Sequence, residues 1–273
     1  MRKYVFSIVL ALCLVAALLP GIPAAADGHN HTCLCGAKNC TQTGTGYEKI
    51  PDDAVWEGIG EDKFKTFEIG KEGETHYYYL TEDINCSSGD SGIYFEGNVV
   101  LCLNGHNIEF SGGQRRLAIK SAADRDTKLT ICDCDRTEHD LTVEYNDNNY
   151  YYTYYGGAIK GYQLDISRGT LNLYNCTITG LNGPSAIDMA GGTALNMYDG
   201  ANVLGNSVSD ESAVSVRGTF NMYGGLIAGN YANSSASYGG GVRVGGSTTA
   251  ATFHMYDGTI QDNLADNGGG VCV

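Results

Sequence analysis

The stretch TFNMYGG at residues 219–225 decides the fold, because the chain repeats it. Close variants are TFHMYDG at residues 252–258, TALNMYDG at 193–200 and TLNLYNC at 170–176. Successive copies begin roughly 25 to 35 residues apart, a period typical of solenoids. The repeat therefore predicts a stack of similar units rather than a single globular α/β unit.

Each copy alternates apolar and polar side chains, the period-two pattern of a β-strand with two different faces. Within TFNMYGG, Phe220 and Met222 alternate with Asn221 and Tyr223. A second apolar position follows each copy, at Ile178, Val203, Ile227 and Ile260. A third apolar segment ends each unit, at residues 186–187, 213–214, 241–242 and 270–271. Each unit is therefore predicted to run strand, turn, strand, turn, strand.

Three short strands cannot bury their apolar faces alone, but they can when stacked coil on coil. The sequence thus predicts an all-β, right-handed parallel β-helix of about six coils, since parallel crossovers are almost always right-handed. The coils are expected at residues 99–121, 129–160, 171–189, 195–216, 220–244 and 253–273.

Equivalent residues of successive coils should form ladders along the axis of the helix. Phe220 and Phe253 would continue Leu171 and Leu195 inside, and Asn206, Asn230 and Asn263 would stack in a turn. Aligning residues 117–120 with 158–160 extends the register backwards, and residues 77–84 would supply a leading strand.

The N-terminus carries an export signal. Arg2 and Lys3 precede an apolar run at residues 5–19, and three alanines at residues 24–26 complete the pattern of a secretory signal peptide cleaved before Asp27. We therefore expect a protein that is secreted or displayed at the cell surface, without membrane insertion after cleavage.

Three regions follow from these patterns. Residues 1–26 form the signal peptide, residues 27–65 a Cys/His-rich segment, linker and N-terminal cap, and residues 66–273 the β-helix, which stops within its repeat as a fragment would. Trp56 and Phe64 are expected to cover the first coil.

The formal net charge of −14 argues against nucleic acid as a partner, because nucleic-acid binding needs a basic face.

The Cys/His-rich segment reads HNHTCLCGAKNC at residues 29–40. His29, His31, Cys33, Cys35 and Cys40 supply the sulfur and imidazole donors that structural zinc prefers. The alternative is a tract without metal, because the spacing is not a paired C-x2-C pattern and an exported chain permits disulfides. No other cofactor is predicted.

The repeat register also brings cysteines together. Aligning residues 129–134 with 171–176 places Cys134 over Cys176, and Cys102 then falls under Cys132. Neighbouring coils bring such residues within the Cα separation of a disulfide. Cys102–Cys132 and Cys134–Cys176 are therefore candidate disulfides, and a ladder of buried thiols is the alternative.

Several motifs occur together: HxHxCxCG after the leader, YYLTEDI at residues 78–84, VVLCLNGHNI at 99–108 and LTICDC at 129–134. With the TFNMYGG repeats, this combination resembles adhesin-like right-handed β-helix surface proteins of gut Firmicutes. The GGAI at residues 156–159 is more weakly similar to the repeats of chlamydial polymorphic membrane proteins, which are adhesins. The resemblance covers nearly the whole mature chain and implies surface adhesion.

Parallel β-helices also host polysaccharide lyases and glycoside hydrolases, which need clustered acids on one face. The predicted outward ladder after the third strands is Lys160, Asp188, Ser215, Arg243 and Cys272. Because one acid stands among unlike residues there, no catalytic constellation is predicted, and a carbohydrate-active enzyme is kept as the alternative.

An insertion at residues 144–155, EYNDNNYYYTYY, lengthens one coil. Tyrosine rings are flat and amphipathic, and suit a sugar or a protein partner. The candidate ligand-binding residues are Tyr150, Tyr151, Tyr152, Tyr154 and Tyr155. The alternative is a β-hairpin whose rings cover the side of the solenoid.

An outward ladder of Tyr174, Tyr198, Tyr223 and Tyr256 is likewise expected either to stack or to present a glycan-binding strip. The resulting hypothesis is a non-catalytic, adhesin-like scaffold that binds a host or environmental glycan or a surface protein.

Overall fold

The computed structural model describes residues 50–273, except 52, 65–67, 88–92, 112–115, 120–126, 146, 235–236 and 246–249. The predicted signal peptide and the candidate zinc ligands His29, His31, Cys33, Cys35 and Cys40 lie outside the described residues. In the part of the chain that is described, no helix has both the length and the apolar character needed to cross a membrane.

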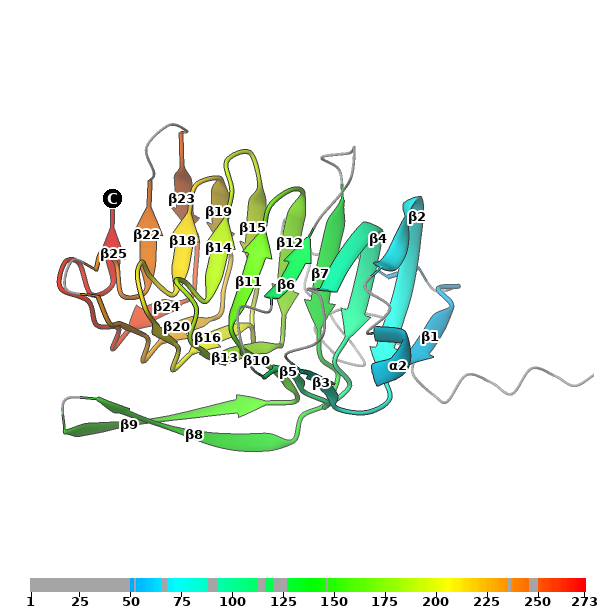
Figure 1. Ribbon diagram of the computed structural model, residues 1–273, viewed down its shortest axis with the longest axis horizontal. Coiled ribbons are helices and arrows are strands. Elements are labelled where there is room, and N and C mark those ends of the chain that lie inside the picture. Colours follow the sequence, from blue (N-terminus) through cyan, green and yellow to red (C-terminus); the bar gives the residue numbers. More distant parts are fainter. Residues whose placement is uncertain are drawn as a thin grey trace, which may run out of the picture. The chain divides into compact units, whose positions relative to one another are not determined.

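The described residues form a parallel β-helix, so the predicted fold class is confirmed (Figure 1). Each coil contributes one strand to each of three parallel sheets. The first sheet contains β2 (Glu68–Leu80), the end of β4 (Ile93–Cys102), β7 (Lys128–Cys132), β12 (Thr170–Tyr174), β15 (Ala194–Met197), β19 (Thr219–Met222) and β23 (Thr252–Met255).

The second sheet contains β3 (Ile84–Cys86), β5 (Ile108–Phe110), β10 (Ala158–Gly161), β13 (Thr177–Leu181), β16 (Asn202–Leu204), β20 (Leu226–Ala228) and β24 (Thr259–Gln261). The third contains the start of β4, β6 (Arg116–Ile119), β11 (Gln163–Ile166), β14 (Ile187–Met189), β18 (Val214–Val216), β22 (Val242–Val244) and β25 (Val271–Cys272). The long strand β4 joins the first and third sheets, because its start pairs with β6 and its end with β7.

The second sheet has seven strands, so the described chain makes seven coils rather than about six. The additional coil consists of β2, β3 and the start of β4, where only a leading strand at residues 77–84 was expected. From residue 170 onward, the coils follow the predicted boundaries.

The predicted alignment of residues 117–120 with 158–160 is wrong. Ile159 pairs with Ile178 in the second sheet, whereas Leu117 pairs with Leu164 in the third. An insertion between β7 and β10 delays the third strand of this coil, so β11 takes the place that residues 158–160 were expected to fill.

The predicted interior ladders are confirmed. Leu171, Leu195, Phe220 and Phe253 are register partners in that order along the first sheet. The Phe220 and Phe253 rings stack with their centroids 4.8 Å apart. These side chains belong to one continuous apolar cluster inside the coils, which is the core of the fold.

One end of the interior is covered by the short helix α2 (Glu61–Phe64). Phe64 is fully buried and meets Phe95 edge to face, with ring centroids 6.4 Å apart. Trp56 begins β1 (Trp56–Ile59), which pairs with β2, and its side chain packs in a separate cluster with Tyr79 rather than in the interior. Phe64 therefore covers the interior of the first coil, and Trp56 does not.

The predicted asparagine stack is also confirmed. The Asn206 amide donates from Nδ2 to Asn230 Oδ1 at 2.8 Å, and Asn230 donates to Asn263 Oδ1 at the same distance. The backbone N–H of Asn206 also donates to Asn230 Oδ1 at 3.0 Å. At the equivalent place one coil earlier, Leu181 donates its backbone N–H to Asn206 Oδ1 at 2.9 Å.

Candidate functional site

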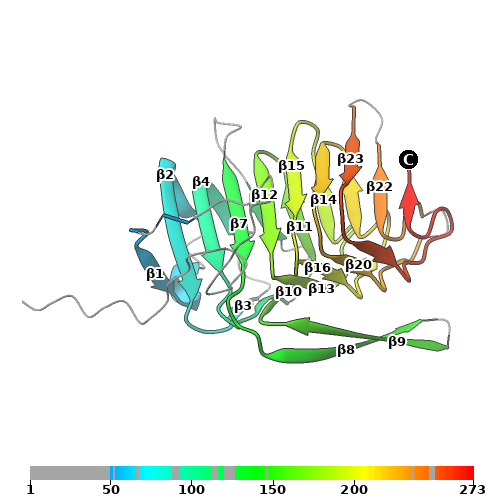
Figure 2. The ribbon, with the colours of Figure 1, turned by 180° about the vertical axis from the view of Figure 1, so that it is seen from behind.

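The tyrosine-rich insertion forms an antiparallel hairpin of β8 (Glu138–Tyr145) and β9 (Asn148–Tyr155), which we call the hairpin. Its base is closed by the Gly156 N–H, which donates to the Thr137 carbonyl at 3.0 Å. The hairpin runs along the second sheet toward the last coils (Figures 1 and 2). The prediction of a hairpin that covers the side of the solenoid is confirmed.

The inner face of the hairpin is packed against the solenoid. Tyr152 and Tyr154 are buried and belong to a cluster with Leu204 and Ala228 of the second sheet. The Tyr152 hydroxyl donates to the Asp262 carboxylate at 3.3 Å. Burial, and then the nearby Asp262 carboxylate, raise the pKa of Tyr152 to about 12, so this hydroxyl is a protonated donor at neutral pH.

Glycines beneath the hairpin allow this close approach. A Cβ on Gly229 would lie 2.6 Å from the Tyr152 ring, and one on Gly205 would lie 2.7 Å from Val143. Both glycines have positive φ, at 64° and 59°. Gly180 occupies the equivalent turn two coils before Gly229, with φ also 64°, but a Cβ there would meet no atom within 4 Å.

The outer face of the hairpin presents two tyrosine rings. Tyr151 is 74% exposed and Tyr155 is 46% exposed, and Thr153 lies between them. The Tyr155 hydroxyl donates to Glu138 at 3.2 Å, and the Thr153 hydroxyl donates to Asp140 at 3.5 Å. Rings four residues apart on a strand are about 13 Å apart. A ligand that touches both rings must therefore be extended.

The hairpin thus divides the five predicted tyrosines into two sets. Tyr151 and Tyr155 face outward, whereas Tyr150, Tyr152 and Tyr154 face the solenoid. Tyr150 stacks on Tyr145, with ring centroids 4.7 Å apart. Only the outward pair is placed to meet a ligand on this face.

The predicted outward tyrosine ladder on the first sheet is stacked. Ring centroids are 4.1 Å apart for Tyr174 and Tyr198, 5.1 Å for Tyr198 and Tyr223, and 4.9 Å for Tyr223 and Tyr256. Tyr174 and Tyr198 are buried, but Tyr256 is 64% exposed. Stacking within the sheet accounts for the buried rings, and Tyr256 is the most exposed member of the ladder.

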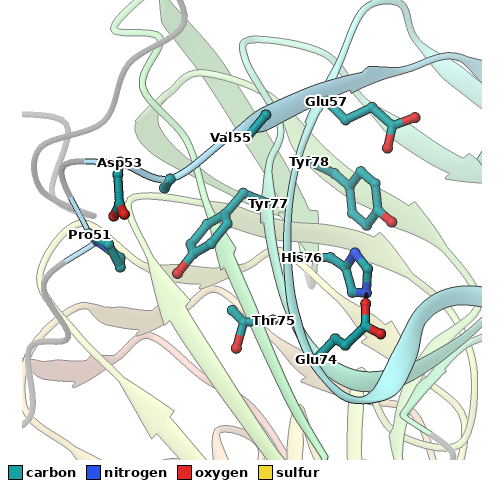
Figure 3. A pocket seen from close by; sticks show the side chains of 10 residues that line it. Pro51, Asp53, Val55, Glu57, Glu74, Thr75, His76, Tyr77 and Tyr78 are labelled. Atoms are coloured by element: carbon teal, nitrogen blue, oxygen red, sulfur yellow. Dashed lines mark ion pairs between the residues drawn. The ribbon is translucent and has the colours of Figure 1, made fainter.

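A pocket of about 460 Å³ lies where β2 extends beyond β1 (Figure 3). One wall is formed by Pro51, Asp53 and Val55. His76 and Tyr78 stack on β2 with ring centroids 5.9 Å apart. His76 Nε2 lies 3.4 Å from the carboxylate of Glu74, which also pairs with Lys71. No sequence motif indicates this pocket, because it depends on where β1 begins along β2.

The outward ladder of the third sheet contains Asp165 where Lys160 was expected, followed by Asp188, Ser215, Arg243 and Cys272 in register. Arg217 pairs with both Asp188 and Glu211, and Arg243 lies 3.3 Å from Glu211. Burial raises the pKa of Asp188, while Arg217 opposes the shift. Two acids paired with two arginines form a charge-balanced network, which suits a structural role.

Cysteines gather where the second and third coils stack. Cys102 and Cys132 are register partners, as predicted, and both are buried. Cys102 Sγ also lies 3.6 Å from Cys134 Sγ. Cys176 packs in the interior cluster, 3.8 Å from the Ile131 carbonyl, whereas Cys134 packs outside it. Cys134 and Cys176 therefore pack in different clusters, and their pairing stays a prediction.

Asp133 lies beside these thiols and is fully buried. Its carboxylate accepts the backbone N–H groups of Gly105 at 3.1 Å, Asp135 at 2.8 Å and Gly157 at 2.6 Å. Burial raises the pKa of Asp133 to about 6. Ligand atoms of Cys102, Asp133 and Cys134 all lie within 4.8 Å of one another, so this group could hold a metal ion.

Comparisons with known proteins find no match for this chain among protein-family models, curated proteins or solved structures.

Proposed function

We propose that this protein is an exported, surface-associated β-helix scaffold that binds an extended glycan on the outer face of the hairpin, without catalysis. One observation carries the proposal. The hairpin turns Tyr152 and Tyr154 onto the solenoid and leaves Tyr151 and Tyr155 exposed on the opposite face. The resemblance of the motifs to adhesin-like surface proteins supports the same function.

The chemistry of the outer face suits a sugar chain. Tyr151 and Tyr155 offer flat apolar rings, and the carboxylates of Glu138 and Asp140 offer hydrogen-bond acceptors to sugar hydroxyls. The two rings are carried by a hairpin whose inner face packs against the solenoid, so the hairpin itself need not become ordered on binding. An uncharged or cationic glycan fits better than an acidic one, because the protein carries a net charge of −14.

A polysaccharide and glycan array on the mature chain from Asp27 tests this proposal. Binding and released products are measured in the same wells. If each ring contributes about 1 kcal/mol, the double variant Tyr151→Ala, Tyr155→Ala should bind roughly thirty-fold more weakly. Tyr256→Ala removes an exposed ring of the first sheet and serves as the matched control, with unchanged affinity expected.

Two outcomes would count against the proposal. Equal loss of binding in the double variant and in Tyr256→Ala would place the glycan elsewhere. Released reducing-end or unsaturated sugars would identify a carbohydrate-active enzyme, and the carboxylates of the third sheet would then be the first to replace.

A further inference from the structure

We propose that Cys102, Asp133 and Cys134 form a binding site for a zinc-like divalent metal ion, which ties the second coil to the third. This site lies at the end of the first sheet, beside the base of the hairpin, where the Gly157 N–H donates to Asp133. The inference does not rest on glycan binding. The site contains none of the candidate zinc ligands at residues 29–40.

The sulfur spacing is the first argument. Cys102 Sγ and Cys134 Sγ are 3.6 Å apart. Two thiolates bound tetrahedrally to one zinc ion, with bonds of about 2.3 Å, lie about 3.8 Å from each other. A disulfide would require about 2.0 Å. The two side chains already have the separation of ligands that share one metal ion.

The buried carboxylate is the second argument. Asp133 is fully buried, and within the described residues its hydrogen bonds come from backbone N–H groups rather than from a cationic side chain. A buried carboxylate without a counter-charge is costly, and a bound divalent ion would supply that charge. The three N–H donors fix the carboxylate orientation, as outer hydrogen bonds do around metal ligands.

The donor set indicates which ion would bind. Two sulfur donors favour zinc over calcium or magnesium, which prefer oxygen ligands. Three protein ligands leave one position of a tetrahedron for water or a further donor. Cys132, the register partner of Cys102, stands beside the site. Because thiols must lose their protons to bind zinc, metal uptake should release protons.

The experiment uses the full mature chain, reduced and then loaded with Zn²⁺ or Co²⁺. Cys33, Cys35 and Cys40 are first replaced by serine, so that the N-terminal segment cannot bind metal through sulfur. This background should retain about one metal ion per chain and show a thiolate-to-cobalt charge-transfer band. Adding Cys102→Ser and Cys134→Ser should abolish both signals, whereas adding Cys86→Ser, a buried cysteine of the interior, should leave both intact.

Other results would overturn the proposal. One such result is that the background protein retains no metal, or binds cobalt without a thiolate charge-transfer band. Another is that the Cys102→Ser, Cys134→Ser variant retains as much metal as the background protein. A third is a Cys102–Cys134 disulfide in mass spectra of the unreduced exported protein. Circular dichroism checks the fold of each variant. If the double replacement unfolds, Cys134→Ser alone replaces it, because Cys134 is only partly buried and this change removes one ligand.

Discussion

Asn230 holds three consecutive coils together with one side chain. Its Oδ1 accepts from Asn206 of the preceding coil, and its Nδ2 donates to Asn263 of the next. Nδ2 also donates to the Val203 carbonyl at 2.9 Å. A buried amide of this kind is fully used, so losing it leaves several neighbours without partners.

Replacing this amide tests its contribution to stability. Asn230→Ala should lower the free energy of unfolding by about 1 to 3 kcal/mol, because buried polar groups on both adjacent coils lose a hydrogen bond. Denaturant unfolding followed by circular dichroism measures the change. Asn233→Ala, at an exposed position three residues later, should change it by less than about 0.5 kcal/mol. Similar losses in both variants would contradict this role.

For single residues, the environment could be predicted from the sequence only where the same residue type recurs in successive repeat units. Asn206, Asn230 and Asn263 recur at the same place in successive units, so their stacking followed from the sequence. Asp133 occurs once, and its environment depends on Gly105 and Gly157, which lie far from it along the chain. No repeat could reveal that burial.

The hairpin is the element that departs from the repeat. Its alternation predicts two faces, but the choice of inner face depends on the second sheet, where Gly205 and Gly229 leave room for side chains. The sequence therefore predicted the insertion and the hairpin, whereas the division of its tyrosines needed the structure. The same insertion displaced the third strand of its coil and caused the misalignment at residues 158–160.

A matched pair of glycines measures how tightly the hairpin is packed. Gly180→Ala should cost about 1 to 2 kcal/mol, because the new side chain sits on a left-handed backbone. Gly229→Ala has the same φ but also drives a methyl group into the Tyr152 ring, so it should cost more. Denaturant unfolding of both variants gives the difference.

The control for this pair of glycine variants removes the Tyr152 ring. In a Tyr152→Ala background the excess cost of Gly229→Ala over Gly180→Ala should disappear, since the clashing ring is absent. If the two glycine variants already cost the same in the native chain, the hairpin does not press on the second sheet.

The whole molecule is a stack in which each coil buries the apolar face of its neighbours. The TFNMYGG repeat was enough to place the coils from residue 170 onward. The first coil was missed because it lacks that motif, and it became visible only through the pairing of β2 with β4. The sequence repeat thus predicted the regular coils of the stack, and the strand pairing seen in the structure identified the first coil.

Position within the stack should set the cost of interior mutations. Phe220 is fully buried between two coils, so Phe220→Ala should cost about 3 to 5 kcal/mol. Phe253 continues the same ladder in the last coil and is only partly buried, so Phe253→Ala should cost less. Thermal and denaturant unfolding measure both variants, and equal losses would contradict the ladder argument.

The hairpin projects from the third coil, yet two of its tyrosines contact the seventh coil. Tyr145 donates to the Asp262 carbonyl at 3.0 Å, and Tyr152 donates to the Asp262 carboxylate. In a simple repeat array each unit is coupled only to its nearest neighbours, so a terminal unit frays by breaking one interface. Here the hairpin adds direct contacts between coils that are not neighbours in the stack. A partner that pulled on its outer face would load several coils in parallel instead of peeling them away one at a time.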